Sequence, residues 1–397
     1  MDDHDDTSES LPANELGSID TDALFAATPV VAESLRAYGA ERGDIRLAHT
    51  DTHARLDARQ PIGRLAREEL EDAMLAPGAT RASGAGNRQV REDPDPWRTC
   101  FERDVDKVRY APAFRRLAHK CQVFIAPDDD HLRTRLTHAI EVAQFAGAVA
   151  RRIGLNPALC EAASLFHDCG HGPAGHASEE AFAEFLPGGF DHATWGAHQI
   201  AAPMNLCDEV IDAIACHSWR LKAPSTPEGE LLSWSDRCCY LAHDFDDAVR
   251  AGIVTYGDLP VEVAEVLGRS QAEQIGSMID AICATATTTG WLGMDPTTAS
   301  AIDAFRKFNY ERIYLRPASR TQAERVIALL RALVEYFIDA PGKIPDVAAG
   351  SVEFPRSGSP ESALEAVRYV ASMTDRYAIS MAVDVLGWRS EALPRSA

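Results

Sequence analysis

The sequence predicts an all-α fold, a helical bundle with additional C-terminal helices, and three observations support it. Apolar residues recur at helical spacing along the 397 residues, strand-like alternation is scarce, and residues typical of helix ends flank the apolar stretches. One stretch shows these signals together. Asn156 and Pro157 form an N-cap and a first-turn proline, the apolar run LCEAASLF follows, and Gly170 marks the end. We expect such helices to hold a site between them.

Composition and charge narrow the class of protein. Hydrophobic residues make up 46% of the chain, as in globular proteins, and no run of 18 apolar residues predicts a membrane span. The acidic N-terminus is unlike a secretory signal, and nine cysteines, an odd number, exclude a complete set of intrachain disulfides. A cytoplasmic protein is therefore expected. The net charge of −21 disfavours binding to nucleic acid or anionic membranes, although a metal ion and a few arginines can still attract a small anionic substrate.

Three side chains within residues 133–179 have the pattern of a metal site that lacks one ligand. His138 lies on the first of two predicted helices and shares a face with Arg135, three residues earlier. His167 and Asp168 end the second helix, directly after its apolar run. A His–Asp pair behind an apolar helix, with a histidine on the preceding helix, is typical of divalent metal ligation.

Asp236 is the candidate for the fourth ligand. It lies in the middle of the helical stretch LLSWSDRCCYLAHD, among apolar and aromatic residues, where an unpaired carboxylate would be costly. Tyr240 and Asp244 follow at i+4 and i+8 and form one stripe with it. The stripe is either the wall of a polar pocket or, equally in keeping with the spacing, a core tyrosine beside a surface salt-bridge face.

A turn rich in glycine and proline, CGHGPAGHASE, follows the His–Asp pair. It carries His176, and Glu179 lies three residues later, where a carboxylate can fix the tautomer of the histidine and raise its pKa to suit a general acid. A lone loop histidine is usually only solvated, but the clustering of histidines here argues against that alternative. His192, after a Gly-Gly-Phe turn, is a further candidate, whereas His217 ends a helix and is as readily a cap.

The order of His138, His167-Asp168 and Asp236 resembles that of the HD-domain metal phosphohydrolases. The closer resemblance is to the deoxynucleoside triphosphate triphosphohydrolases of the dGTPase type, and it spans most of residues 95–390. An HD dipeptide alone is common, but the matching segments in this order are specific. The segments are FERDVDKVRYAPAFRRLAHKCQVF, RTRLTHAIEVAQFA, LFHDCGHGPAGHASE, FDHATWG, SDRCCYLAHDFDDAVRAG, FNYERIYL and VASMTDRYA.

The resemblance implies a role for each matching residue. The implied ligands of one divalent metal ion per subunit are His138, His167, Asp168 and Asp236. The implied contacts to the α-phosphate and to the sugar with its 3′-hydroxyl are Arg135 and then Gln122, Tyr240 and Asp244. The implied catalytic histidine, its orienting acid and a second histidine near the phosphates are His176, Glu179 and His192. The pattern does not distinguish Mn, Mg, Fe, Co and Zn.

The same resemblance implies the reaction and the assembly. Family members release intact triphosphate and a deoxynucleoside, and they are usually oligomers of four or six subunits. The expected function is therefore metal-dependent hydrolysis of dGTP or several dNTPs, with water attacking the α-phosphorus, in a homo-oligomer that acts on a small-molecule substrate. Two alternatives remain: an HD phosphohydrolase acting on another nucleotide phosphate ester, and a non-catalytic nucleotide-sensing HD protein.

The chain departs from the family pattern near the expected substrate rather than at the metal. The replacements are Ala174 for phenylalanine, Cys121 for threonine, and Ala193, Trp195 and His198 for asparagine, glutamine and arginine. We therefore expect these replacements to alter which base is preferred rather than to abolish the activity. The expected parts of the chain are a disordered acidic tail at 1–20, an N-terminal helical extension and linker at 21–94, an HD phosphohydrolase core at 95–250, and a C-terminal helical region packing on that core at 251–397.

Overall fold

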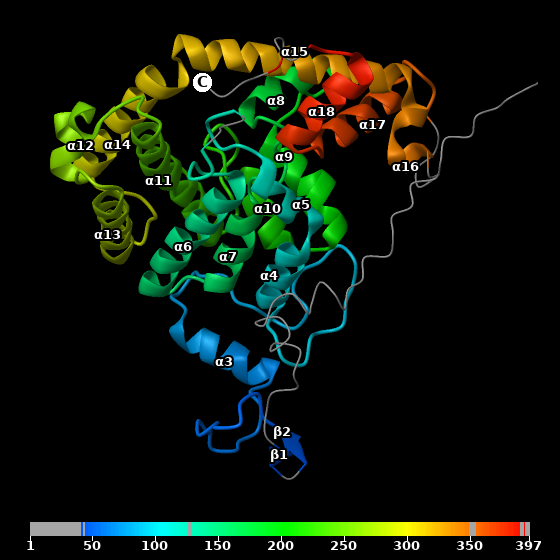
Figure 1. Cartoon of the computed structure of the whole chain (residues 1–397). Helices are drawn as coiled ribbons and strands as arrows, with labels where there is room; N and C mark the ends of the chain where they lie inside the picture. The colour runs from blue at the N-terminus through cyan, green and yellow to red at the C-terminus, as the bar shows by residue number, and fades with distance from the viewer. Residues whose placement is uncertain (1–40, 43, 126–128, 349–354, 390–392, 394–397) are drawn as a thin grey trace, which may run out of the picture. The chain divides into compact units, whose positions relative to one another are not determined.

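A computed structural model describes residues 41–42, 44–125, 129–348, 355–389 and 393 (Figure 1). Helices make up most of these residues, and the one pairing of strands among them is a two-stranded antiparallel sheet, which confirms the all-α prediction. The chain forms two compact units, residues 1–61 and 62–397. The predicted acidic tail at 1–20 and residues 21–40 of the predicted helical extension lie outside the described residues, and the division into four parts stays a prediction. The strands of the first unit are β1 (Glu41–Arg42) and β2 (Ile45–Arg46).

Helices in the first half of the second unit begin and end at the signals that the sequence carries. The helix with His138 starts at a capping box formed by Thr134 and Thr137 and ends at Gly154, whose φ of 77° is left-handed. Asn156 caps the next helix by accepting from the N–H groups of Ala158 and Leu159. The helices here are α3 (Arg64–Met74), α4 (Cys100–Tyr110), α5 (Pro112–Arg116), η1 (Leu117–His119), α6 (Arg135–Ile153), α7 (Pro157–Phe166), α8 (His176–Phe182), η2 (Ala183–Phe185), α9 (His192–Trp195), the π-helix η3 (Gly196–Ala201), η4 (Ala202–Met204), α10 (Asp208–Cys216) and α11 (Pro227–Arg250).

The remainder of the second unit is also helical. Its longest helix, α15, lies along α8, α17 and α18 (Figure 1). The helices are η5 (Tyr256–Asp258), α12 (Val261–Val266), α13 (Gln271–Thr289), α14 (Pro296–Asn309), the π-helix η6 (Tyr310–Tyr314), α15 (Pro317–Asp339), η7 (Pro341–Lys343), α16 (Pro345–Ala348), α17 (Pro360–Ala371) and α18 (Asp375–Leu386).

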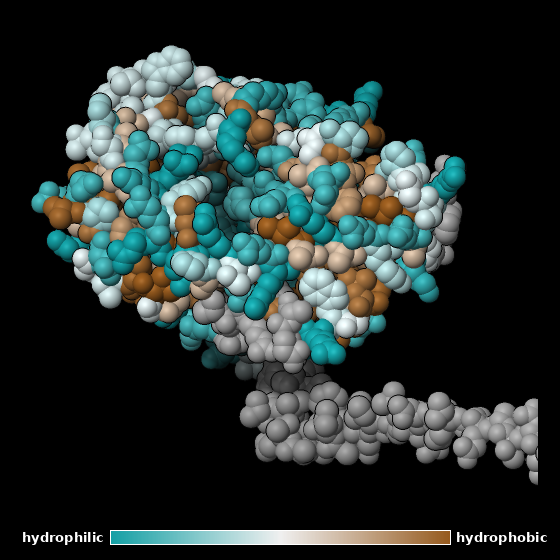
Figure 2. Space-filling view, turned by 90° about the horizontal axis from the view of Figure 1, so that it is seen from above, coloured by the Kyte–Doolittle hydropathy of each residue, from teal (hydrophilic) through white to brown (hydrophobic). Residues whose placement is uncertain are grey.

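Two hydrophobic clusters form the core of the second unit. The first cluster joins the buried faces of α4, α6, α7, α10 and α11, with Phe101, Phe145 and Phe166 among its largest side chains. The second cluster joins α8 with α15, α17 and α18 around Phe182 and Phe337. Hydrophilic residues predominate on the face shown in Figure 2, and hydrophobic residues occur there only in small separate groups. The candidate site residues come from helices of both clusters.

Candidate active site

The packing of α6, α7 and α11 brings the four predicted metal ligands together. His138 lies in the first turn of α6, His167 and Asp168 directly follow α7, and Asp236 is in the middle of α11. The Oδ1 atom of Asp236 is 3.1 Å from His138 Nε2 and 3.5 Å from His167 Nε2. The Oδ1 atom of Asp168 is 3.4 Å from His167 Nε2. Two imidazoles and two carboxylates from three helices therefore form one cluster, in which His167 lies near both carboxylates.

The chemistry of these donors fits a divalent ion. The Nδ1 atom of His167 lies 2.7 Å from the Ser164 carbonyl, to which it donates, so that the buried Nε2, which has no hydrogen-bond partner, is the nitrogen left for a metal ion. Burial alone would lower the pKa of His167, yet the carboxylates of Asp168 and Asp236 raise it to about 9. A bound cation would take the place of the proton that this surplus of negative charge attracts.

Arg135 forms a salt bridge with one residue of this metal-ligand cluster, Asp168. Its guanidinium is 1% exposed, and Nη1 donates to Asp168 Oδ2 over 2.7 Å. Gly175 makes room for it: this residue has a φ of 62°, and a Cβ atom there would lie 2.1 Å from Arg135 Nη2. The buried Nε of Arg135 has no hydrogen-bond partner, so this donor remains available to an anion.

The predicted catalytic residues form a second cluster beside the first. Ligand atoms of His171, His176, Glu179 and His192 lie within 4.8 Å of one another. The sequence assigns Glu179 to His176, but the hydrogen bond of its Oε1 atom goes to His192 Nδ1, at 2.6 Å. The ring of His171 stacks on that of His192 with centroids 3.7 Å apart and contacts His176 edge-on at 4.9 Å.

Protonation of His176 differs from what its spacing to Glu179 suggests. Part of the side chain is open to solvent, while the ring is packed against neighbouring histidines. That burial of the ring, together with the charges of His192 and Arg135, lowers the pKa of His176 to about 4. In the free protein the histidine is therefore neutral at pH 7, and a proton donor here needs the negative charge of a bound ligand to raise its pKa.

His217 belongs to the site and is more than a helix cap. Its Nδ1 atom lies 2.8 Å from the Ile214 carbonyl, and its Nε2 atom lies 3.2 Å from Nε2 of His192. Because Glu179 accepts from the other nitrogen of His192, both facing Nε2 atoms carry lone pairs unless a proton or a cation lies between them. The sequence places His217 at a helix end but gives no sign of this partner.

Asp375 is a residue of the site that the sequence did not single out. Its Oδ2 atom accepts from the Cys121 N–H and its Oδ1 atom from the Ala174 N–H, each at 2.9 Å. Ala174 has a φ of 60°, a left-handed conformation that is costly for alanine. Asp375 therefore ties the segment of Gln122 to the turn of His176. Its one signal in the sequence was the family-like segment VASMTDRYA.

The predicted sugar-binding residues lie along α11 and on the segment before α6. Tyr314, which the sequence reasoning missed, donates to Asp244 Oδ2 over 2.5 Å, and burial raises the pKa of Asp244 to about 8. Burial also raises the pKa of Tyr240 to about 12. The buried atoms Asp244 Oδ1 and Gln122 Oε1 have no hydrogen-bond partner. These groups can recognise hydroxyls, because a neutral carboxyl donates and a free amide oxygen accepts.

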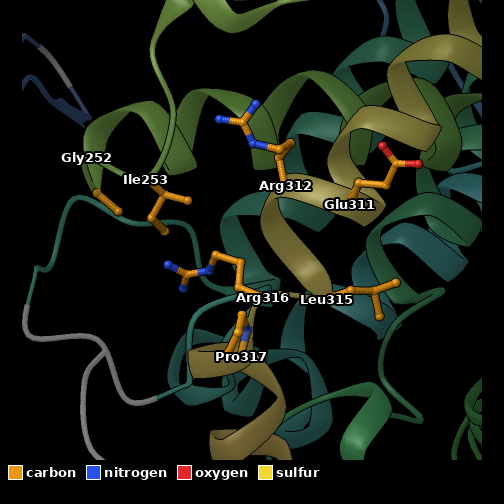
Figure 3. A pocket seen from close by; sticks show the side chains of 8 residues that line it. Gly252, Ile253, Glu311, Arg312, Leu315, Arg316 and Pro317 are labelled. Carbon is orange, nitrogen blue, oxygen red and sulfur yellow. The ribbon is translucent and has the colours of Figure 1, made fainter.

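A wide hollow elsewhere on the molecule contains none of the predicted site residues. It has a volume of about 580 Å³ and lies between the end of α11 and the segment that joins η6 to α15. Figure 3 shows Arg312 and Arg316 beside it, with Glu311 and Leu315 from the same segment. We assign the chemistry to the histidine and aspartate clusters, since the hollow offers no set of converging metal ligands among its lining residues.

Known families match the regions that build this site. The HD domain matches residues 135–241, which include all four predicted metal ligands, and the phosphohydrolase-associated domain matches residues 292–383. A deoxyguanosinetriphosphate triphosphohydrolase-like protein of Caldanaerobacter subterraneus subsp. tengcongensis is 37% identical over 319 residues, covering 79% of this chain and 92% of the relative. The chain belongs to this family of HD phosphohydrolases.

Further members of the family align over the same share of the chain. The deoxyguanosinetriphosphate triphosphohydrolase-like protein of Clostridium tetani is 32% identical, with 79% of this chain and 93% of the relative covered. That of Desulfatibacillum aliphaticivorans is 34% identical, with 79% and 95% covered. The predicted family is therefore confirmed. The part of this HD phosphohydrolase that the structure describes has no helix both long and apolar enough to cross a membrane.

Proposed function

We propose that this HD phosphohydrolase cleaves deoxynucleoside triphosphates into a deoxynucleoside and inorganic triphosphate. The observation that carries the proposal is the arrangement of α11, on which Asp236 joins the metal-ligand cluster while Tyr240 and Asp244 follow one and two turns later. A sugar held by the latter two side chains brings the phosphorus nearest to it, the α-phosphorus, to the ligand cluster. Water attack at this phosphorus releases the whole triphosphate when O5′ is the group that leaves.

The donor set supplies the electrophilic part of the reaction. A divalent ion held by His138, His167, Asp168 and Asp236 would polarise a phosphoryl oxygen and lower the pKa of a water molecule. Arg135 would hold the α-phosphate through the buried Nε that has no partner in the protein.

Bond breaking requires a proton on the leaving oxygen. In the proposed reaction water attacks the α-phosphorus and the sugar O5′ is the leaving group, which departs as an alkoxide unless it is protonated. We assign the proton to His176. The triphosphate brings negative charge next to this histidine and thereby raises its pKa from the low value of the free protein. Glu179, through its hydrogen bond to His192, keeps the neighbouring ring in place.

A product assay tests the proposal. Each of the four dNTPs and GTP is incubated with the protein and Mn, Mg, Co or Fe, and ion chromatography separates triphosphate from pyrophosphate and phosphate. Triphosphate and a deoxynucleoside are expected in equal amounts, and GTP is expected to react about 10²-fold more slowly than dGTP, because a buried site built for one hydroxyl pattern rejects another. Release of pyrophosphate or phosphate, or equal turnover of GTP and dGTP, would contradict the proposal.

A further inference from the structure

A separate pocket lies next to the segment that carries the proposed metal ligand Asp168. It has a volume of about 340 Å³, within the range of pockets that hold small molecules, roughly 300–1,000 Å³. Cys169, the residue after Asp168, forms part of its lining. The metal ligands and the predicted catalytic residues are absent from that lining. The pocket therefore adjoins the active site without being part of it.

The ionisable side chains that line this pocket are basic. Arg116, Lys120 and Arg368 line it, and no aspartate or glutamate is among the lining residues. Arg116 has no ion pair among the described residues, its Nε is buried without a hydrogen-bond partner, and burial lowers the pKa of its guanidinium. A half-buried cation whose buried Nε has no partner is unfavourable, and an anion bound beside it would supply that partner.

Lys120 adds a second donor to the same wall. Its side chain is 2% exposed, and Nζ donates to the carbonyl oxygens of His171 and Ala371, the latter at 2.9 Å. Burial and the neighbouring Arg116 lower the pKa of Lys120 to about 7, and an anion bound beside it would hold the amine in its protonated form. The protonated amine has three N–H donors, so one is left over when these two carbonyls are satisfied. At the rim, Arg368 pairs with Glu365 and donates to Gln199 over 3.1 Å, which fixes its guanidinium.

Part of the pocket lining is apolar. Trp195 lines the pocket together with Ile200 and Met204. The indole is half-buried and packs against Phe190 with ring centroids 5.0 Å apart. A flat apolar body can pack against this wall while an anionic group faces Arg116.

We propose that this pocket is a second ligand site, which binds a small phosphate ester with a planar apolar body. The phosphate contacts Arg116 and Lys120, and the apolar body packs against Trp195. The phosphate supplies the anionic partner that Arg116 lacks, whereas Arg368 already pairs with Glu365. The proposal is independent of the reaction assigned to the metal cluster.

Titration calorimetry with phenyl phosphate tests this site on the full-length protein. Inorganic phosphate, which lacks the ring, and phenol, which lacks the charge, are the comparison probes, and both are expected to bind more weakly. Arg116→Gln is expected to weaken phenyl phosphate binding by about tenfold to a hundredfold, the effect of losing a hydrogen bond to a charged group. Arg115→Gln removes the same charge from the preceding residue, which is exposed and outside the lining, and should leave the affinity unchanged.

A second variant and a crystal soak test the same site independently of Arg116→Gln. Arg368→Gln alters only the rim and should weaken binding by a smaller factor, so that a result is obtained even where Arg116→Gln fails to fold. Crystals soaked with 4-bromophenyl phosphate should show the anomalous signal of bromine beside Trp195. Equal affinity in the wild type and both lining variants, or a bromine signal only at the metal cluster, would overturn the proposal.

Discussion

The metal-ligand cluster (His138, His167, Asp168 and Asp236) and the turn that leads to His176 lie side by side, but different parts of the chain position them. The ligands come from α6, α7 and α11, whose buried faces belong to the first hydrophobic cluster. The turn that leads to His176 is held by Asp375, at the start of α18, and by helices of the second cluster. We therefore expect binding of a metal ion and positioning of the proposed proton donor to depend mainly on different cores.

The largest expected loss of activity comes from a change in the metal-ligand cluster. Asp236→Asn removes an anionic ligand from the first cluster while keeping the shape of the side chain. Metal content should fall to near zero, and kcat should fall by about 10³-fold or more, since a catalytic ion supplies several kcal/mol. Elemental analysis and steady-state assays measure the two quantities. Asp303→Asn, on the exposed face of α14, is the matched control. Stoichiometric metal in Asp236→Asn would remove this residue from the ligand set.

The next variant distinguishes loss of the proton donor from loss of the metal ion. His176→Ala should keep the metal but lower kcat by about 10²- to 10⁴-fold, the usual size of a general acid contribution. Metal content and kcat are compared in one preparation, with the exposed residue His198 as the control in His198→Ala. Loss of the metal would make His176 a ligand, and full activity would mean that solvent supplies the proton.

A smaller effect tests whether the second core positions the proton donor. Asp375→Asn keeps one acceptor oxygen and loses the other, so one of the two N–H groups of Cys121 and Ala174 is left without its partner. We expect kcat to fall about tenfold at unchanged metal content, with no further fall when the change is added to His176→Ala, because both act on one step. Losses that multiply in the double variant would show that Asp375 acts elsewhere.

The metal-ligand cluster and the cluster around His176 also differ in how far they could be predicted from the sequence. His138, His167 and Asp168 lie close together along the chain on helices with clear capping signals, so their convergence could be predicted from local patterns. The partner of Glu179 could not: spacing of three residues pairs it with His176, whereas the 3₁₀-helix η2 and the following turn bring His192 to it.

Long-range partners were beyond sequence reasoning for the same physical reason. Asp375 meets Ala174 across 201 positions and Tyr314 meets Asp244 across 70, and both contacts depend on how the helices pack. No periodicity in the sequence encodes such packing. The family-like segments VASMTDRYA and FNYERIYL marked both places, but they did not say which residue makes the contact.

The smallest expected effect concerns stability at the sugar side. Burial raises the pKa of Asp244 to about 8, compared with about 3.9 in an unfolded chain. Between these values the folded state holds a proton that the unfolded state has lost, so this group makes the free energy of unfolding fall as the pH rises from about 4 to about 8.

Asp244→Asn removes that titration. Relative to the wild type, the variant should gain stability between pH 5 and pH 9, as urea unfolding at both pH values would measure. Asp303→Asn should show no such gain. A difference between Asp244→Asn and the wild type that stays constant with pH would mean that Asp244 is already ionised in the folded protein.

Isotope labelling tests the central claim, that the stripe on α11 places the α-phosphorus at the metal cluster. The dNTP that reacts fastest is hydrolysed in ¹⁸O-labelled water, and mass spectrometry locates the label. One ¹⁸O atom in each triphosphate and none in the deoxynucleoside is expected, because the water oxygen joins the α-phosphorus and O5′ leaves with the deoxynucleoside. Label in the deoxynucleoside, or products consisting of a nucleoside monophosphate and pyrophosphate, would contradict the claim.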